Sequence, residues 1–146
     1  MSLSKWKAFS LALACLAAIA AGVAAFKGGC PACIETTTGG CAHMKCYYAF
    51  HAAFLVEVLA ASAALGLAFV KCKIGRRWLA AVCVLAQACV LAALYTPLGG
   101  LCASPEMACH GTAAIVDVLA LVLCVGCIIA MVFADPARAN RPKRGL

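Results

Sequence analysis

The sequence predicts an all-α integral membrane protein, a four-helix transmembrane bundle built from two successive hairpins. Of the 146 residues, 66% are hydrophobic and only 12% are charged, whereas soluble domains have about half apolar and a quarter charged residues. The apolar residues form four runs of roughly 20, the length that an α-helix needs to cross about 30 Å of hydrocarbon. A recurring order of small motifs indicates that the second half of the chain repeats the first.

The four apolar runs cover residues 6–26, 48–70, 78–98 and 111–133. They are continuously apolar rather than alternating and rich in Ala and Leu, so we expect helices and not strands. The first run is longer than the apolar core of a signal peptide, and we expect it to stay as a helix. Residues 1–134 then form one four-span domain, and residues 135–146 form a basic tail that we expect to be poorly ordered.

The basic residues predict the orientation. Ten of the twelve lie at the start of the first run, in the 71–77 connection or in the tail, and only Lys27 and Lys45 lie in the other two connections. Positive residues favour the cytoplasmic side, so we expect both termini and the 71–77 loop in the cytoplasm. Trp6 and Trp78 would then lie at the cytoplasmic boundary. The predicted location is the bacterial inner membrane.

The formal net charge of +7 does not require a nucleic-acid partner. We expect this charge to set the topology and to attract anionic lipids to the basic tail. The expected surroundings are the lipid bilayer and other membrane-protein subunits.

The predicted repeat follows the order of its motifs. Each half has a Trp, an Ala-Cys span, Gly-Gly, a Cys, Met-x-Cys and a second span with one acid. Both hairpins begin in the cytoplasm, so the repeat is parallel, about an axis along the membrane normal. Ala, Gly and Ser allow the close helix approach that such a bundle needs in lipid.

Each half carries one acid inside its second span, Glu57 or Asp117. A charge at mid-membrane is costly, so such acids usually face the bundle interior and often mark a function. The functional alternatives are a proton or ion relay and a polar cap on a quinone or substrate site. The structural alternative is a protonated carboxyl bonded to a backbone carbonyl, to His51 or to Gln87.

The spacing of the two acids predicts matching positions. The interval from Cys46 to Glu57 is longer by three positions than the interval from Cys109 to Asp117. Three residues rise about 4.5 Å along a helix, so we expect both carboxyls on the same interior face at slightly different depths. Burial favours the neutral form, and we expect both to be largely protonated.

Six of the twelve cysteines fall on the outer side: Cys30, Cys33, Cys41, Cys46, Cys102 and Cys109. An even number on an oxidising face favours disulfides that staple the loops. By the repeat, Cys41–Cys46 corresponds to Cys102–Cys109, which leaves the Cys30-Pro-Ala-Cys33 motif. Intramembrane Cys124 and Cys127 also have CxxC spacing, and we expect them to act as small apolar residues.

Two other interpretations of the outer cysteines stay open. Cys30 and Cys33 are candidate redox residues that would exchange electrons with the second loop and a quinone. The architecture resembles that of periplasmic disulfide-forming quinone reductases, although CPAC lies well before the second span and no Arg follows it. Alternatively, thiols and thioethers suit a soft ion such as Cu(I); the further candidate ligands are His43, Met44, Met107 and His110.

CAHMKCYYAFHAA and TPLGGLCASPEMACHGTAA together resemble a small bacterial family of four-helix membrane proteins catalogued as a domain of unknown function. The residues that carry the resemblance are Cys41, Met44, Lys45, Cys46, Cys102, Met107 and Cys109. Tyr47 stands where many members have His, and CPAC is an addition to the family pattern. The resemblance implies an accessory role beside an ABC-type transporter.

The chain shows no nucleotide-binding loop and no nucleophile–base pair in its spans. We therefore expect an accessory or assembly subunit of a membrane complex, without a cofactor, rather than a stand-alone enzyme. The alternatives are a quinone-coupled thiol-disulfide oxidoreductase and a soft-metal binding or transport protein.

Overall fold

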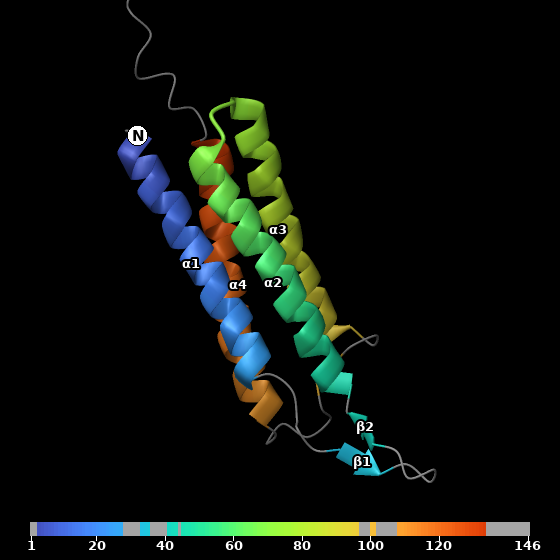
Figure 1. The fold of residues 1–146 in the computed structure, drawn as a ribbon. Coiled ribbons are helices and arrows are strands. Elements are labelled where there is room, and N and C mark those ends of the chain that lie inside the picture. The colour runs from blue at the N-terminus through green and yellow to red at the C-terminus, as the bar shows by residue number, and fades with distance from the viewer. Residues whose placement is uncertain are drawn as a thin grey trace, which may run out of the picture.

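The computed structural model describes residues 3–27, 33–35, 41–43, 45–96, 100–101 and 108–133. These contain four long helices, α1 (Leu3–Lys27), α2 (Lys45–Phe69), α3 (Lys73–Tyr95) and α4 (Ala108–Val132) (Figure 1). All four are long and apolar enough to cross a membrane. The predicted all-α, four-span architecture is confirmed. The tail at 135–146 lies outside the described residues.

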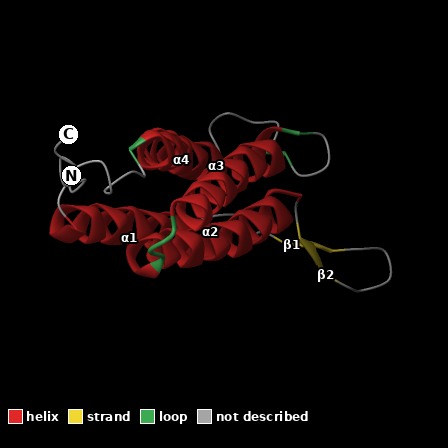
Figure 2. Ribbon diagram, turned by 90° about the horizontal axis from the view of Figure 1, so that it is seen from above, coloured by secondary structure: helices red, strands yellow, loops and turns green. Residues whose placement is uncertain are grey.

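A short antiparallel strand pair was not predicted. β1 (Cys33–Glu35) pairs with β2 (Cys41–His43), and Ile34 lies opposite Ala42. The two strands extend beyond the bundle at the start of α2 (Figures 1 and 2). The end of the bundle next to them is called the hairpin end here. The opposite end, with the start of α1, the α2–α3 turn and the end of α4, is called the basic end.

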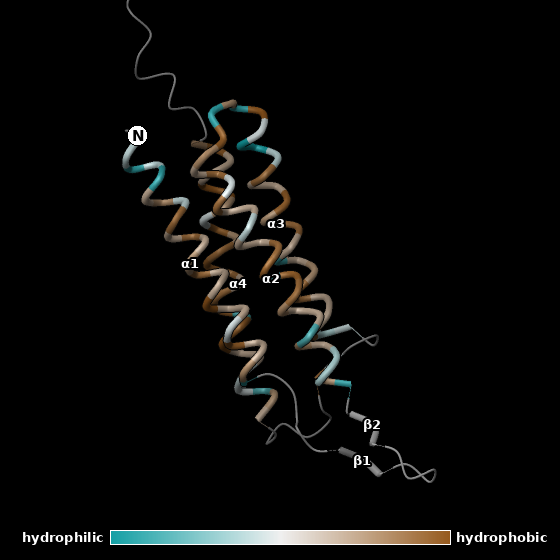
Figure 3. The backbone as a smooth tube through the Cα atoms, in the orientation of Figure 1, coloured by the Kyte–Doolittle hydropathy of each residue, from teal (hydrophilic) through white to brown (hydrophobic). Residues whose placement is uncertain are grey.

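The helices form a closed ring in chain order. Contacts are extensive between α1 and α2, α2 and α3, α3 and α4, and α1 and α4. Most residues along the helices are hydrophobic, and hydrophilic residues gather near the helix ends (Figure 3). This distribution is what a bundle in a bilayer requires, because the hydrocarbon offers no partners to polar groups.

Buried residues recur at spacings of three and four along each helix. In α3 the buried positions include Arg76, Ala80, Cys83, Gln87, Val90 and Leu94. This is the heptad spacing of helices that cross at about 20° in a four-helix bundle. Many interior positions are alanine, whereas large side chains such as Leu55 and Leu85 are about two-thirds exposed. Outward apolar side chains cost nothing in lipid, which is as apolar as they are.

The helix bounds agree with two successive hairpins, but in a different register from the one predicted. When α3 is aligned on α1, and α4 on α2, each from its first residue, the buried positions coincide closely. In this alignment Cys46 corresponds to Cys109, as predicted. Trp6, however, corresponds to Arg76 and not to Trp78: Trp6 is 1% exposed inside the bundle, and Trp78 is 68% exposed.

Gly126 sets the distance between α1 and α4. A Cβ at this position would lie 2.5 Å from Cδ2 of Leu13, which is itself buried. We expect Gly126→Val to lower the free energy of unfolding by about 1–3 kcal/mol, the usual cost of overpacking. Reversible unfolding in mixed micelles measures this change in the free energy of unfolding. Gly111→Ala is the control, because nothing lies within 4 Å of its added Cβ; an equal loss in both variants would contradict the close approach.

Candidate functional site

Glu57 lies at the centre of the bundle. It occupies a buried heptad position of α2, and its side chain is 0% exposed. Nε2 of Gln87, which is buried on α3, donates a hydrogen bond to Glu57 Oε2 over 3.2 Å. Of the partners proposed for this acid, the structure selects Gln87. His51 is exposed, and its Nδ1 instead lies 2.9 Å from the carbonyl oxygen of Tyr47.

One further hydrogen-bond donor is needed to satisfy the two remaining side-chain oxygens of Glu57 and Gln87. Glu57 Oε1 and Gln87 Oε1 are buried and have no hydrogen-bond partner among the described residues. Both are acceptors when the carboxyl is ionised, but a protonated carboxyl also carries an O–H donor. A neutral carboxyl and an amide each offer both a donor and an acceptor, so they are complementary. The arrangement therefore suits the neutral Glu57 that burial in a membrane favours.

Two thiols lie beside this pair. Cys83 on α3 and Cys127 on α4 are each 2% exposed, belong to one buried cluster, and have interacting thiols. Cys83 Sγ also lies 3.6 Å from the carbonyl oxygen of Ala60 on α2. Cys127 thus lies near Cys83 on a different helix, in addition to Cys124, its partner in the CxxC spacing. We call Glu57, Gln87, Cys83 and Cys127 the core polar cluster.

The core polar cluster connects three helices through side chains that can share protons. It contains no basic side chain, and the described residues contain no group of three or more His, Cys, Asp or Glu that could hold a metal ion. Its hydrogen bonds join α2 to α3, and its thiols join α3 to α4. This connectivity suits it to fixing the register of the bundle.

Asp117 does not lie at the position that matches Glu57. Counted from the first residues of α2 and α4, Glu57 corresponds to Ala120, and Asp117 corresponds to half-buried Phe54. Three residues turn a helix by about 300°, which is short of a full turn, and this moves Asp117 off the interior face. Its Oδ2 accepts a hydrogen bond from the hydroxyl of exposed Tyr95. The prediction that both acids share one interior face is wrong.

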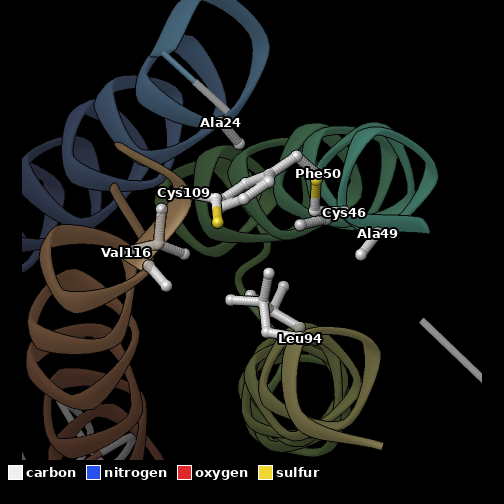
Figure 4. Packing of buried hydrophobic residues seen from close by; sticks show 10 residues of the cluster. Ala24, Cys46, Ala49, Phe50, Leu94, Cys109 and Val116 are labelled. Atoms are coloured by element: carbon white, nitrogen blue, oxygen red, sulfur yellow. The ribbon is translucent and has the colours of Figure 1, made fainter. Parts of the chain in front are cut away.

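The two predicted Met-x-Cys motifs end inside the bundle. Cys46 and Cys109 are the second residues of α2 and α4, and both are 1% exposed. They belong to one apolar cluster at the hairpin end, where the ring of Phe50 lies between them in the view of Figure 4. This placement matches the predicted equivalence of the two cysteines.

No disulfide occurs among the cysteines whose side chains the structure describes, and Cys109 carries a free thiol. Each predicted pair has at least one member outside those side chains: Cys30, Cys33, Cys41 and Cys102. Because Cys109 is free, the structure does not show the predicted Cys102–Cys109 disulfide, and the other pairings stay predictions. The same holds for the ligand candidates His43, Met44 and Met107. The remaining candidate, half-buried His110, lines a pocket of about 490 Å³ at the hairpin end with Tyr95 and Leu101.

A groove on the outer surface runs between α1 and α2. It has a volume of about 560 Å³, and most of its lining consists of small or apolar side chains, among them Ala14, Ala18, Gly22, Ala61 and Ser62. Nothing lies within 4 Å of a Cβ added to Gly22. The sequence did not predict this groove. It also did not predict the buried cluster around Trp6.

The fold defines a polytopic membrane protein that encloses a carboxyl, an amide and two thiols within a helical bundle. The chain belongs to the family described as a domain of unknown function (DUF4418), which matches residues 11–134. The predicted membership of an uncharacterised membrane-protein family is confirmed. No curated protein and no solved structure matches the chain.

Proposed function

We propose that the protein is an accessory or assembly subunit that binds another membrane protein through the groove between α1 and α2. The observation that carries this proposal is the combination of small side chains on that groove with its outward position. Helices associate in lipid through small residues that let backbones approach closely. On α1, Ala14, Ala18 and Gly22 recur every four residues and therefore form one small-residue face along the groove.

Gly22 supports an outside partner. A helical glycine costs about 1 kcal/mol relative to alanine, so its presence needs a reason. For Gly126 the reason lies within this chain, because a Cβ there would collide with Leu13. At Gly22, in contrast, nothing lies within 4 Å of an added Cβ. Close approach of a helix from another protein supplies the missing reason. The family resemblance makes an ABC-type transporter the candidate partner.

The orientation belongs to the same proposal. The start of α1 and the α2–α3 turn carry most of the described basic residues and lie at one end of the bundle. The positive-inside rule assigns that end to the cytoplasmic side of a bacterial inner membrane. The groove then faces lipid across the bilayer, where only a membrane-embedded partner reaches it.

The test is purification in mild detergent followed by mass spectrometry. A stoichiometric membrane-protein partner is expected with the native chain, and Ala18→Leu, which fills the groove, is expected to lower its recovery by about tenfold, as overpacking of a close contact would. Ala88→Leu is the matched control, because Ala88 is an exposed alanine on α3 outside the groove. Equal recovery with both variants would contradict the groove.

The same preparation distinguishes the accessory role from the two alternatives, an enzyme and a metal carrier. A pure chain that oxidises a dithiol while reducing a quinone would establish the oxidoreductase alternative, with Cys30 and Cys33 as its first targets for substitution. Stoichiometric Cu(I) binding by the isolated chain would establish the soft-metal alternative. Either result without a protein partner would overturn the accessory role.

A further inference from the structure

A second groove, at the basic end of the bundle, has a different chemistry. It lies between α3 and α4, has a volume of about 380 Å³, and is lined by Ile74, Arg77, Trp78, Ala81 and Met131. Ile74 and Trp78 are about 70% exposed, so the groove opens on the outer face. Four of its five lining residues are apolar, and Arg77 is its one charged residue.

The groove lies near the start of α3 and the end of α4, where the membrane interface is expected for spanning helices. Its α3 residues belong to the first three turns of that helix, and Met131 belongs to the last turn of α4. Trp is enriched at the interface, where its ring contacts both apolar chains and headgroups. Trp78 and Arg77 therefore lie where a phospholipid changes from acyl chain to phosphate.

Arg77 lacks an acidic partner among the described residues. Glu57 and Asp117 are the carboxyls of the described helices, and they hydrogen-bond to Gln87 and Tyr95. Gln87 lies well beyond Arg77 along α3, at a separation of about 15 Å by the helical rise. The guanidinium is thus available to an anion from the membrane, and its planar fork of donors matches a phosphate group.

We propose that the groove between α3 and α4 is a binding site for one anionic phospholipid. An acyl chain lies along Ile74, Trp78, Ala81 and Met131, and Arg77 binds the phosphate. Basic pockets between transmembrane helices on the cytoplasmic side bind anionic headgroups in this way. The site is separate from the predicted attraction of such lipids to the tail at 135–146, and it does not depend on the groove between α1 and α2.

The two tryptophans provide a direct test. The full chain is reconstituted into phosphatidylcholine vesicles with the same small fraction of brominated phosphatidylglycerol or brominated phosphatidylcholine, and bromine quenching of Trp fluorescence is measured. Trp78 lines the groove, while Trp6 is 1% exposed. Measuring the Trp78→Phe variant and subtracting its signal isolates the contribution of Trp78 in the native chain.

The brominated anionic lipid is expected at Trp78 at roughly five times its bulk fraction, which corresponds to about 1 kcal/mol for one basic residue. The brominated zwitterionic lipid is expected at its bulk fraction. Arg77→Gln should abolish the enrichment, and Lys7→Gln, an exposed cation at the start of α1, should keep it. Equal quenching by the two lipids, or an equal loss in both variants, would overturn the site.

Discussion

Gln87→Leu is expected to lower the free energy of unfolding by about 1–2 kcal/mol. The change removes the one donor that reaches Glu57 Oε2 and leaves the carboxyl inside the bundle without a partner. A buried polar group without a hydrogen bond costs about 1–3 kcal/mol, and interhelical bonds in membranes contribute up to about 1.7 kcal/mol. Reversible unfolding in mixed micelles of increasing dodecyl sulfate content measures the loss.

Two further variants separate the hydrogen bond from the space that the side chains fill. Glu57→Gln keeps a donor and an acceptor and should change stability by less than about 0.5 kcal/mol, because an amide replaces a neutral carboxyl. Glu57→Leu with Gln87→Leu removes both polar groups and should recover most of the loss, giving a clear coupling energy in the double-mutant cycle. Additive effects would show that the two side chains do not interact.

The same Glu57→Gln variant distinguishes structure from function. If the carboxyl only joins α2 to α3, the variant should bind the partner of the complex as well as the native chain does. A stable variant that loses the activity of the complex would show that the acid itself has to exchange a proton or bind an ion. Asp117→Asn is a separate test, because Asp117 bonds Tyr95 outside the core polar cluster.

Hydropathy was sufficient to predict the four helices, because the cost of unpaired backbone groups in hydrocarbon leaves few alternatives for runs of this length. It could not predict which face of each helix points inward. Lipid is as apolar as the bundle interior, and here alanines fill much of the interior while large residues such as Leu55 and Val118 point outward. Aligning similar sequence therefore paired Glu57 with Asp117, although the buried positions pair Glu57 with Ala120.

Polar residues predicted contacts only where the sequence offered few possible hydrogen-bond partners. Glu57 was recognisable because an acid in a span must be buried or bonded, and Gln87 is the one amide side chain in the four helices. The contact of Cys83 with Cys127 joins residues on two different helices, and no local spacing indicates it. Arg76 was assigned to a cytoplasmic loop by charge alone, but helix α3 begins earlier, at Lys73, and turns Arg76 into the bundle.

Trp6→Ala is expected to cause the largest loss of stability among these substitutions, about 3–5 kcal/mol. Trp6 is a large, fully buried side chain that packs with Leu67, Ala80 and Ala130 from the three other helices. Its Nε1 donates a hydrogen bond of 3.0 Å to the carbonyl oxygen of Leu67. Leu67 lies in the last turn of α2, where carbonyl groups lack helical partners. Trp6, which belongs to α1, therefore caps the C-terminus of α2.

Arg76 takes part in the same cap. Removing Trp6 therefore costs stability through the lost contact with Arg76 as well as through the lost packing volume. Its guanidinium lies 4.9 Å from the Trp6 ring, and its Nε donates a hydrogen bond to the carbonyl oxygen of Val70 over 2.6 Å. A cation at a helix C-terminus is stabilising, and the aromatic face holds it in place. Trp6→Phe should keep most of the packing and lose about 1 kcal/mol with the hydrogen bond.

Trp78→Ala provides the matched control, since the same side chain is removed at a position that is 68% exposed. It should change the free energy of unfolding in mixed micelles by less than about 1 kcal/mol, because lipid or detergent replaces its contacts. Equal losses for Trp6→Ala and Trp78→Ala would mean that the two residues are equivalent after all. That result would restore the register in which both tryptophans open matching spans, and it would place Arg76 outside the bundle.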